Sequence, residues 1–377
     1  MKLNSLTIEN FRCFEQIHLT LHPQLTVLIA PNGAGKTTLL DAARIAVWPF
    51  VKAFDLASQT GKSATIQIED VRGEPNEQGD LEPRIPAVVM ASGQWSAGQS
   101  KTWEQWRDKL KVRTKAKEDV DTKGLEQYAQ SLQNKVFTAG NAPFDLPLVA
   151  YLGTGRLWYQ GRYNSTFEDK KLEKSVFSRT WGYKDCLAVS SSYKQFEDWF
   201  GWIYLSYREM QLDALENQTP FDQSTNHFKQ AIDVVVNAVN SITKAATGWG
   251  DIAYRSTAQK QIVLQHPQHG IMPLSLLSDG LRNAVVMVAD LAFRCSKLNP
   301  HYGAKAAFET GGVVMIDEVD MFLHPAWQQT ILQSLQDAFP KVQFIVTTHS
   351  PQVLTTCKAE QIRVLESTPQ GIKVHEP

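Results

Sequence analysis

The sequence predicts an α/β fold in which a mixed sheet carries an inserted, mainly helical lobe. Two observations support this prediction. Short apolar runs typical of buried strands, separated by segments of helical spacing, occur near both ends of the chain. Between them, from about residue 160 to 250, the chain is rich in aromatic residues and mostly helical in pattern. We therefore expect a discontinuous head, formed by residues 1–160 and 250–377, and an inserted lobe, residues 160–250, for dimer or partner contacts.

The composition is that of a globular protein with little net charge. Of the 377 residues, 43% are hydrophobic and 20% are charged, and the formal net charge is −1. A nucleic-acid surface would therefore have to be a local patch. The four cysteines lie far apart, which argues against a disulfide framework or a zinc site. Because the sequence shows neither a signal peptide nor an apolar run of membrane-spanning length, we expect a cytoplasmic protein without a membrane partner.

The first fifty residues predict three strands and a helix. Residues 3–9 and 17–21 alternate between apolar and polar, as in half-buried strands. Residues 25–30 form a continuous apolar run, which is typical of a central strand. Helical spacing follows from residue 37 to 48, and we expect Pro49 to end that helix.

The rest of the head is predicted from the same patterns. Residues 64–71 and 85–91 suggest strands on either side of a polar loop, and residues 102–137 suggest a charged helical segment. Residues 146–152 read as another buried strand. After the lobe, we expect three short strands, at residues 252–255, 261–264 and 271–274. An apolar helix ending near residue 295 and two more buried strands, at residues 313–318 and 343–350, are expected to follow.

A near-match to a phosphate-binding loop lies between the third strand and the first helix. The stretch APNGAGKTTLLDA, starting at Ala30, follows G-x-x-x-x-G-K-[ST] except that Ala30 replaces the first glycine. The first position donates less to the phosphates than the later ones, so alanine is acceptable there if the local backbone angle is ordinary. The competing interpretation is a plain glycine turn between a strand and a helix.

A diphosphate needs inward-pointing backbone N–H groups, a helix N-terminus, a lysine and a hydroxyl for Mg²⁺. Gly33 and Gly35 permit the tight backbone path. We expect Lys36 to bridge the β- and γ-phosphates, Thr37 to bind Mg²⁺ and Thr38 to contact the α-phosphate. The predicted ATP-binding residues of this loop are Asn32, Gly33, Ala34, Gly35, Lys36, Thr37 and Thr38.

Two later strands end in residues that suit phosphate chemistry. In VVMIDEVD, Asp317 would hold Mg²⁺ and Glu318 would polarise the attacking water. In FIVTTHS, His349 would contact the γ-phosphate and that water. Acidic residues or a histidine at a strand end are often merely structural. The phosphate-binding loop earlier in the chain favours the catalytic interpretation, with Lys36, Glu318 and His349 as catalytic residues.

A fourth motif, LSDGLRN, precedes an apolar helix. Ser278 and Gly280 offer hydroxyl and amide donors at the start of that helix, which is a typical anion site. The alternative is an ordinary helix N-cap formed by Ser278 or Asp279.

Together the four motifs resemble the ABC-type ATPase heads of the SMC and RecF group. IENFRCF with VLIAPNGAGKTTLLDA is similar to the N-terminal signature of that group, and LLSDGLRN to its LSGGQ-type signature. IDEVDMFLHPAWQ resembles its Walker B motif and D-loop, and TTHSP its switch-histidine segment. The resemblance covers about residues 1–50 and 270–355. It implies a P-loop NTPase with an ABC-ATPase-head-like mixed sheet, which hydrolyses ATP with Mg²⁺.

The resemblance also implies a homodimer or higher oligomer in which two heads sandwich ATP. The P-loop of one subunit would face Ser278, Asp279 and Gly280 of the other. Arg12 would lie near the nucleotide. A Q-loop would connect the γ-phosphate to the helical lobe, and Arg156 or Gln160 in LGTGRLWYQ occupies a suitable position for this role.

Within the group, LPLVAYLGTGRLW, SRTWGYKDCL and IDEVDMFLHPAWQ resemble compact bacterial ATPases of anti-phage systems. These include the Septu-type ATPase that accompanies an HNH nuclease, and relatives found beside retrons. The resemblance implies a nuclease effector such as an HNH protein as partner, because no nuclease domain of its own is recognised in the sequence.

Several positions depart from the pattern of the group. Ala30 replaces a glycine, Asp279 and Leu281-Arg282 replace residues of the LSGGQ signature, and His324 stands where an aspartate is common. Each change is expected to slow hydrolysis, which would suit a switch.

Two alternative functions stay open at this point. The first is a RecF-like repair ATPase that binds duplex DNA, for which the basic residues between Lys101 and Lys117 would contact phosphates. A solvated helix or loop is the favoured interpretation of that segment. The aromatic residues between Trp199 and Tyr207 are favoured as core or interface over a base-stacking platform. The second alternative is a scaffold that binds ATP without hydrolysing it.

Overall fold

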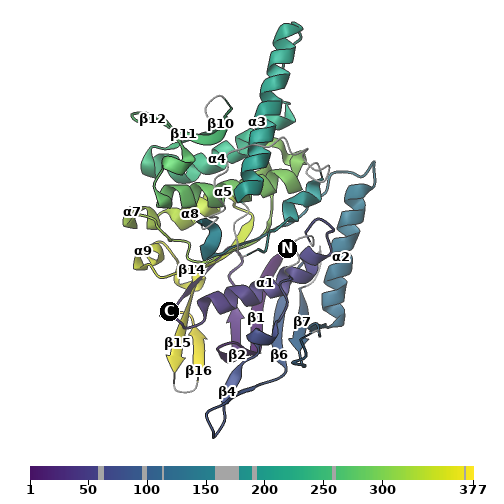
Figure 1. Ribbon diagram of the computed structural model, residues 1–377, viewed down its shortest axis with the longest axis vertical. Coiled ribbons are helices and arrows are strands. Elements are labelled where there is room, and N and C mark those ends of the chain that lie inside the picture. Colours follow the sequence, from purple (N-terminus) through teal and green to yellow (C-terminus); the bar gives the residue numbers. More distant parts are fainter. Residues whose placement is uncertain are drawn as a thin grey trace.

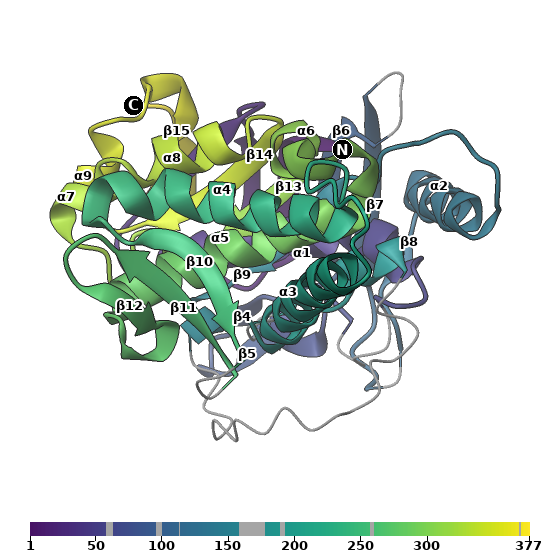
Figure 2. The same cartoon turned by 90° about the horizontal axis from the view of Figure 1, so that it is seen from above.

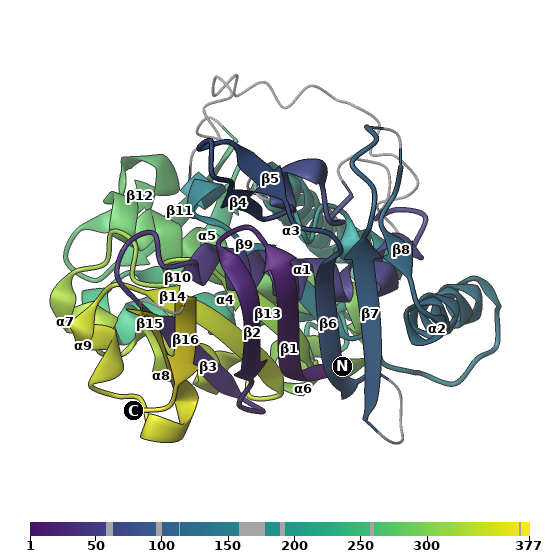
Figure 3. The same cartoon turned by 90° about the horizontal axis from the view of Figure 1, so that it is seen from below.

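The computed structural model describes residues 1–57, 63–95, 100–112, 114–157, 178–188, 193–256, 260–368 and 371–377. Two sheets lie on opposite sides of helix α1 (Lys36–Lys52), which contacts strands of both (Figures 1 and 3). Further helices cover the other face of the larger sheet (Figure 2). This is the α/β arrangement expected from the sequence.

The larger sheet has six strands in the order β16-β15-β3-β14-β13-β9. All neighbours are parallel except β16, which runs antiparallel to β15. Every residue of β9, β13 and β14 is buried, which explains the continuous apolar runs in the sequence. The bounds are β3 Leu25–Ile29, β9 Leu148–Leu152, β13 Gly312–Ile316, β14 Val342–Thr348, β15 Ile362–Thr368 and β16 Gly371–His375.

The second sheet is antiparallel, in the order β2-β1-β6-β7-β8. Gln343 of β14 links the two sheets, because its side chain accepts from the Leu3 backbone N–H at 2.8 Å and donates to the Leu3 carbonyl at 2.7 Å. The bounds are β1 Lys2–Phe11, β2 Phe14–Thr20, β6 Ala87–Gln94, β7 Lys101–Arg107 and β8 Lys117–Glu118.

Helix α1 does not end at Pro49, contrary to the sequence prediction, and continues to Lys52. Proline lacks the N–H that would bond the carbonyl of Ile45, four residues earlier. That carbonyl instead accepts a hydrogen bond from Gln105 Nε2 at 2.7 Å. The next carbonyl, of Ala46, accepts one from Trp103 Nε1 at 2.8 Å. Strand β7 therefore supplies the donors that let a proline remain inside a buried helix.

The predicted charged helix at residues 102–137 is also wrong in its first part. That part is strand β7, in which Trp103, Gln105 and Arg107 are buried and the intervening residues are not. The helix α2 (Val120–Phe137) begins only after Asp119, whose side chain accepts from the Thr122 backbone N–H. Polar side chains on the buried face of β7 hid its period of two.

The predicted strand at residues 64–71 is absent from the structure. Residues Ile68–Asp70 form a 3-10 turn instead, and Val71 makes an isolated bridge to Phe11. The Asp70 carboxylate accepts from the Gln67 backbone N–H at 2.8 Å, which stabilises the turn. The polar loop that follows contains a short hairpin, β4 (Gly73–Pro75) and β5 (Leu81–Pro83).

The helices of the lobe pack on the head rather than apart from it. Helices α3 and α4 both contact α5 (Asp279–Leu298), and α4 also contacts α8. The outer part of α3 stands away from the rest of the molecule (Figure 1). The division into head and lobe stays a prediction. The helix bounds are α3 Tyr193–Glu216, α4 His227–Thr247, α6 Ala306–Glu309, α7 Pro325–Gln328, α8 Ile331–Ala338 and α9 Pro351–Leu354.

The three short strands predicted after the lobe are confirmed as a small antiparallel sheet, β10-β11-β12, which contacts α4 and α3 (Figure 2). Their bounds are β10 Gly250–Arg255, β11 Gln261–His266 and β12 Gly270–Pro273.

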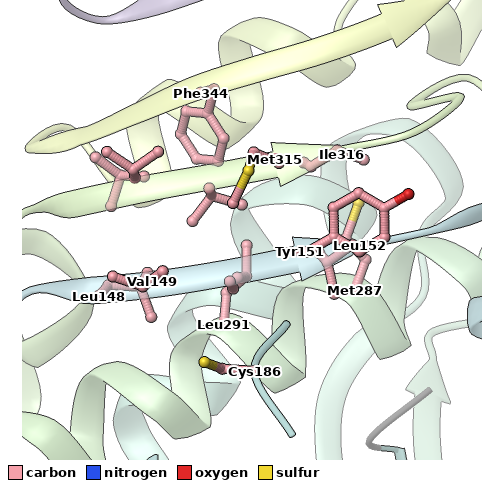
Figure 4. Packing of buried hydrophobic residues seen from close by; sticks show 14 of the residues in the cluster. Leu148, Val149, Tyr151, Leu152, Cys186, Met287, Leu291, Met315, Ile316 and Phe344 are labelled. Carbon is pink, nitrogen blue, oxygen red and sulfur yellow. The ribbon is translucent and has the colours of Figure 1, made fainter. Parts of the chain in front are cut away.

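Helix α5 packs against the larger sheet through an apolar layer. Figure 4 shows Met287 and Leu291 of α5 beside β9, close to Tyr151 and Leu152, with Met315 of β13 above them. Each of these side chains is buried. Helix α5 is thus tightly packed on β9, which is the sheet neighbour of the strand that precedes Asp317.

The aromatic residues of α3 belong largely to the same core. Trp199, Phe200 and Tyr207 are buried, and the ring of Trp199 lies 4.7 Å from that of Phe293 in α5. Trp202 and Tyr204 are partly buried against this core. The structure thus confirms the core interpretation over a base-stacking platform.

The Pro49–Gln105 arrangement predicts a coupled effect on stability. In Gln105→Leu, the Ile45 carbonyl loses its donor, whereas adding Pro49→Ala restores a backbone N–H near that carbonyl. We expect Pro49→Ala to be more favourable by about 1 kcal/mol in the Gln105→Leu background than in the wild type. Urea unfolding of the two single variants and the double variant measures this coupling. A coupling of zero would show that Gln105 does not compensate for the proline.

Candidate active site

The phosphate-binding loop connects β3 to α1, as the motif requires. Gly33 and Gly35 have φ angles of +80° and +90°, which favour glycine. A side chain at Gly35 would also collide with the ring of Phe14 and lie 2.8 Å from the sulfur of Cys13. Within the described part of this loop, positive φ is confined to these two glycines. Ala30 therefore occupies a position that alanine tolerates.

Lys36 is held by its own loop. Its Nζ donates to the carbonyl oxygens of Ala30, at 2.8 Å, and Pro31, at 3.3 Å. Burial lowers the pKa of the Lys36 ammonium, and the nearby carboxylates of Asp317 and Glu318 act against that shift. The ammonium thus lies at the opening of the loop, facing the acidic end of β13.

Thr37 and Asp317 meet although 280 residues separate them in the chain. The Thr37 hydroxyl donates to Asp317 Oδ2 at 3.0 Å. The other carboxylate oxygen, Oδ1, accepts from the Thr347 hydroxyl at 2.6 Å. A hydroxyl and a carboxylate are hard oxygen ligands of the kind that Mg²⁺ takes beside a nucleotide. The pair therefore fits the metal site that the sequence predicts.

Glu318 follows Asp317 in an unusual backbone conformation. Its φ is +48°, which is uncommon for a residue other than glycine. Its backbone N–H donates to the Thr347 hydroxyl at 2.8 Å, and its side chain is half-buried. Such strain concentrates at functional sites, where surrounding contacts enforce it. Thr347 thus fixes both Asp317 and Glu318, a role that sequence reasoning missed although TTHS lay within a quoted motif.

His349 lies at the same edge of the sheet. Strands β13 and β14 are parallel neighbours with Ile316 opposite Val346, so both end beside the phosphate-binding loop. The imidazole is exposed, whereas the flanking Ser350 is buried and caps α9. The structure therefore brings His349 to the edge at which Asp317 and Glu318 lie, with an accessible ring.

The LSDGLRN segment forms the start of α5. Ser278 is its N-cap, with the hydroxyl accepting from the Leu281 backbone N–H at 3.5 Å, so the N-cap interpretation is confirmed. Ser278 and Asp279 are exposed, and Asp279 pairs with Arg282. Gly280 is buried, and a side chain there would collide with the backbone carbonyl of Phe322.

Arg12 lies in the turn between β1 and β2 that packs on the phosphate-binding loop. Its Nη1 donates to Asp41 of α1 at 2.6 Å, and its Nε donates to Asp70 at 2.8 Å. Burial alone would lower the pKa of Arg12, but the two carboxylates outweigh it and raise that pKa. Asp41 is one helical turn beyond Thr38, so Arg12 lies near the start of α1.

Of the two Q-loop candidates, only Arg156 lies within the residues that the structure describes. Arg156 is buried, and its guanidinium donates to the backbone carbonyls of Asp317, at 2.6 Å, and Glu318, at 2.7 Å. Arg156 therefore contacts the backbone, and not the carboxylates, of the two acidic residues that follow β13. Gln160 lies outside the described residues.

The basic segment between Lys101 and Lys117 is partly neutralised. Lys101 and Lys117 lie near Asp121 and Asp108, and Arg107 is buried with its guanidinium on the Ile66 carbonyl. Lys109, Lys111 and Lys115 complete the described basic residues, and Arg113 lies outside them. The contacts favour a solvated edge over a continuous phosphate-binding surface.

Comparison with protein families identifies the class of this chain. A family model described as "AAA domain" matches residues 5–238, and a second, described as "AAA domain, putative AbiEii toxin, Type IV TA system", matches residues 165–355. The chain therefore belongs to the AAA domain family. It is an α/β P-loop ATPase whose fold is that of an SMC head.

Three relatives illustrate what this chain is similar to. The whole chain is 23% identical to the "Retron Vc95 probable ATPase" of Vibrio cholerae serotype O1 biovar El Tor, 76% of which it covers. It is 21% identical to the "Retron Ec83 probable ATPase" of Escherichia coli, covering 99% of this chain and 74% of that protein. A segment of 89 residues, 24% of this chain and 12% of the relative, is 36% identical to "Septu protein PtuA" of Bacillus mycoides (strain KBAB4).

Among solved structures, the SMC head bound to the C-winged helix domain of ScpA matches with a TM-score of 0.56 at 12% identity. The match covers 100% of this chain and 98% of the other. The SMC head domain from Thermotoga maritima matches with a TM-score of 0.52 at 14% identity, over 100% and 99% of the two chains. These likenesses show the fold.

Within the described residues, none of the helices combines the length and apolar character needed to cross a bilayer.

The position of Thr347 predicts a metal-dependent defect. Thr347→Val keeps the shape of the side chain but removes the donor to Asp317 and the acceptor for the Glu318 N–H. We expect the Mg²⁺ concentration for half-maximal ATP hydrolysis to rise about 10- to 100-fold. Thr26→Val, the same change in buried strand β3, is the matched control. An equal Mg²⁺ requirement in the two variants would contradict this role of Thr347.

Proposed function

We propose that this ATPase is a dimeric switch in which two heads sandwich ATP and thereby control a partner effector. The observation that carries the proposal is the hydrogen bond between Thr37 and Asp317. It joins the phosphate-binding loop to the acidic strand end in the arrangement that a Mg–nucleotide site needs.

The residues at this edge suit hydrolysis of the terminal phosphate. The loop N–H groups and Lys36 would hold the phosphates, and Thr37 with Asp317 would hold Mg²⁺, which neutralises phosphate charge when bound. Glu318 would orient and polarise the attacking water, and His349 would contact the γ-phosphate beside it. The strained backbone of Glu318 supports this assignment, because strain of this kind concentrates at functional sites.

The exposed start of α5 supports the second half of the proposal. Ser278 and Asp279 present hydroxyl and backbone donors to solvent at the N-terminus of a 20-residue helix. Two large apolar side chains flank them, since Leu276 is 70% exposed and Phe322 is 51% exposed. A second copy of the head would cover this surface, and Ser278 would then complete the site on the partner's P-loop.

Glu318→Gln is expected to separate ATP binding from hydrolysis. The amide cannot polarise water, so ATP should stay bound, trap dimers or higher oligomers and nearly abolish phosphate release. Size-exclusion chromatography with ATP and a phosphate assay measure both effects. Unchanged turnover would contradict the role of Glu318.

The same variant tests the composite site. Ser278→Arg should block the partner's site, so each of Glu318→Gln and Ser278→Arg is expected to be inactive alone. In a mixture made before ATP is added, half of the dimers are mixed, and each mixed dimer retains one intact site of two. Activity should therefore recover, to at most about a quarter of the wild type. No recovery above the sum of the two variants would argue against sites shared between subunits.

Helix α3 is the best-placed element for an effector. Its base packs on α5 through Trp199 and Phe293, and its outer half exposes Met210, Leu212 and Leu215. The state of the ATP site would thus reach α3 through α5. The relatives of retron and Septu systems support a nuclease effector in anti-phage defence as the partner.

Leu212→Glu with Leu215→Glu is expected to abolish binding of a nuclease encoded beside this protein, while ATP hydrolysis stays at the wild-type rate. Co-expression with that neighbour followed by affinity purification measures binding. Glu209→Lys, a charge change on the same helix, is the control. Retention of the nuclease by the double variant would exclude α3 as its docking site.

A further inference from the structure

The guanidinium of Arg156 is almost fully used as a backbone clamp. Its Nη1 donates to the carbonyls of Gly153, at 3.1 Å, and Asp317, at 2.6 Å. Its Nη2 donates to the Glu318 carbonyl at 2.7 Å, and its Nε donates to Asn283 Oδ1 at 2.8 Å. Four of its five N–H groups thus have neutral acceptors. The side chain fixes the two peptides that carry the proposed metal ligand and the proposed catalytic carboxylate.

Asn283 connects this clamp to helix α5. It lies in the first turns of α5 and is 1% exposed. Its Oδ1 accepts from Arg156, and its Nδ2 donates to the Met321 carbonyl at 2.9 Å. One amide therefore joins α5 to both ends of the turn that follows β13.

That turn is strained at both ends. Glu318 has φ of +48° and Phe322 has φ of +64°. Between them, the Met321 N–H donates to the Glu318 carbonyl at 3.1 Å, which is the same oxygen that Arg156 Nη2 holds. Strained backbone persists only where its surroundings enforce it, and here Arg156 and Asn283 supply the enforcing contacts.

Burial keeps these contacts strong. Arg156 is 3% exposed, and burial lowers its pKa to about 10, while Asp317 and Glu318 oppose the shift. The guanidinium therefore stays charged at neutral pH. Charge-assisted hydrogen bonds in a low-dielectric setting are stronger than neutral ones in water, so the link from Asn283 through Arg156 to the Glu318 carbonyl is a strong one.

We propose that Arg156 and Asn283 are positioning residues that couple the two ATP sites of the dimer. The inference rests on the proposed function. Ser278 and Asn283 share helix α5, and Ser278 would face the ATP held by the other subunit. Glu318 acts on the ATP held by its own subunit. Arg156 and Asn283 would thus connect the ATP held by the other subunit with Glu318, which acts on the ATP of its own subunit.

The coupling has a measurable signature. Hydrolysis by the wild type should depend cooperatively on ATP, with a Hill coefficient above one and at most about two, the number of sites. Breaking the clamp should return the Hill coefficient to about one. Turnover at saturating ATP should fall by up to about 100-fold, because Glu318 is no longer held in place. The KM for ATP and the ATP-dependent dimer should persist.

The test uses the full chain and two variants. Asn283→Ala removes the link to α5, and Arg156→Lys keeps the charge but loses the planar fork. Arg179→Lys is the matched control, because Arg179 clamps carbonyls at the other end of the same helix, including that of Leu298 at 2.8 Å. Hill coefficient, turnover, dimerisation with ATP and thermal midpoint are measured for each.

Loss of cooperativity in Asn283→Ala or Arg156→Lys, with the dimer intact and Arg179→Lys unaffected, supports the coupling. Three results overturn it. These are a non-cooperative wild type that still dimerises with ATP, cooperativity unchanged in both clamp variants, and loss of the dimer in both of them. Absence of any ATP-dependent dimer in the wild type would instead refute the proposed function itself.

Discussion

The burial of helix α1 between two sheets is the constraint on which the site depends. Strands of the antiparallel sheet contact one side of α1, and strands of the parallel sheet contact the other. The helix cannot shift without disturbing both, so the phosphate-binding loop at its start is fixed relative to β13 and β14. Gln343 adds a hydrogen-bonded link between the sheets near their far edge. The meeting of Thr37 with Asp317 follows from this arrangement.

The sequence predicted the parallel core because its strands contain continuous apolar runs, as in β13 and in residues 344–346 of β14. The prediction from sequence failed where a polar side chain is buried and forms a hydrogen bond with a backbone group far away in the chain. Gln105 and Arg107 made β7 look like a charged helix, yet each is buried and donates to a backbone carbonyl, of Ile45 and of Ile66 respectively. The prediction that Pro49 ends α1 is wrong for the same reason, because the donor that compensates for the proline, Gln105, lies 56 residues later in the chain. Such pairings have no signal in local periodicity.

The candidate site shows the same division. The sequence predicted the residues whose side chains carry the chemistry and whose motifs have fixed spacing. These are Lys36, Thr37, Asp317, Glu318 and His349. The supporting residues were not assigned these roles, since they act on backbone carbonyls and other side chains. Thr347, Asn283 and Arg156 lay in quoted motifs, and only their three-dimensional contacts reveal what each one holds.

The length of helix α3 would amplify a small movement at its base. From Trp199, where it rests on α5, to Leu215 near its tip, the helix rises about 24 Å at 1.5 Å per residue. A tilt of about 10° at the base would displace the tip by roughly 4 Å on the same geometry. That displacement is large compared with the sub-ångström adjustments that a closely packed core permits. A small rotation of α5 in the proposed dimer interface would therefore reach the tip as a movement large enough for a bound protein to sense.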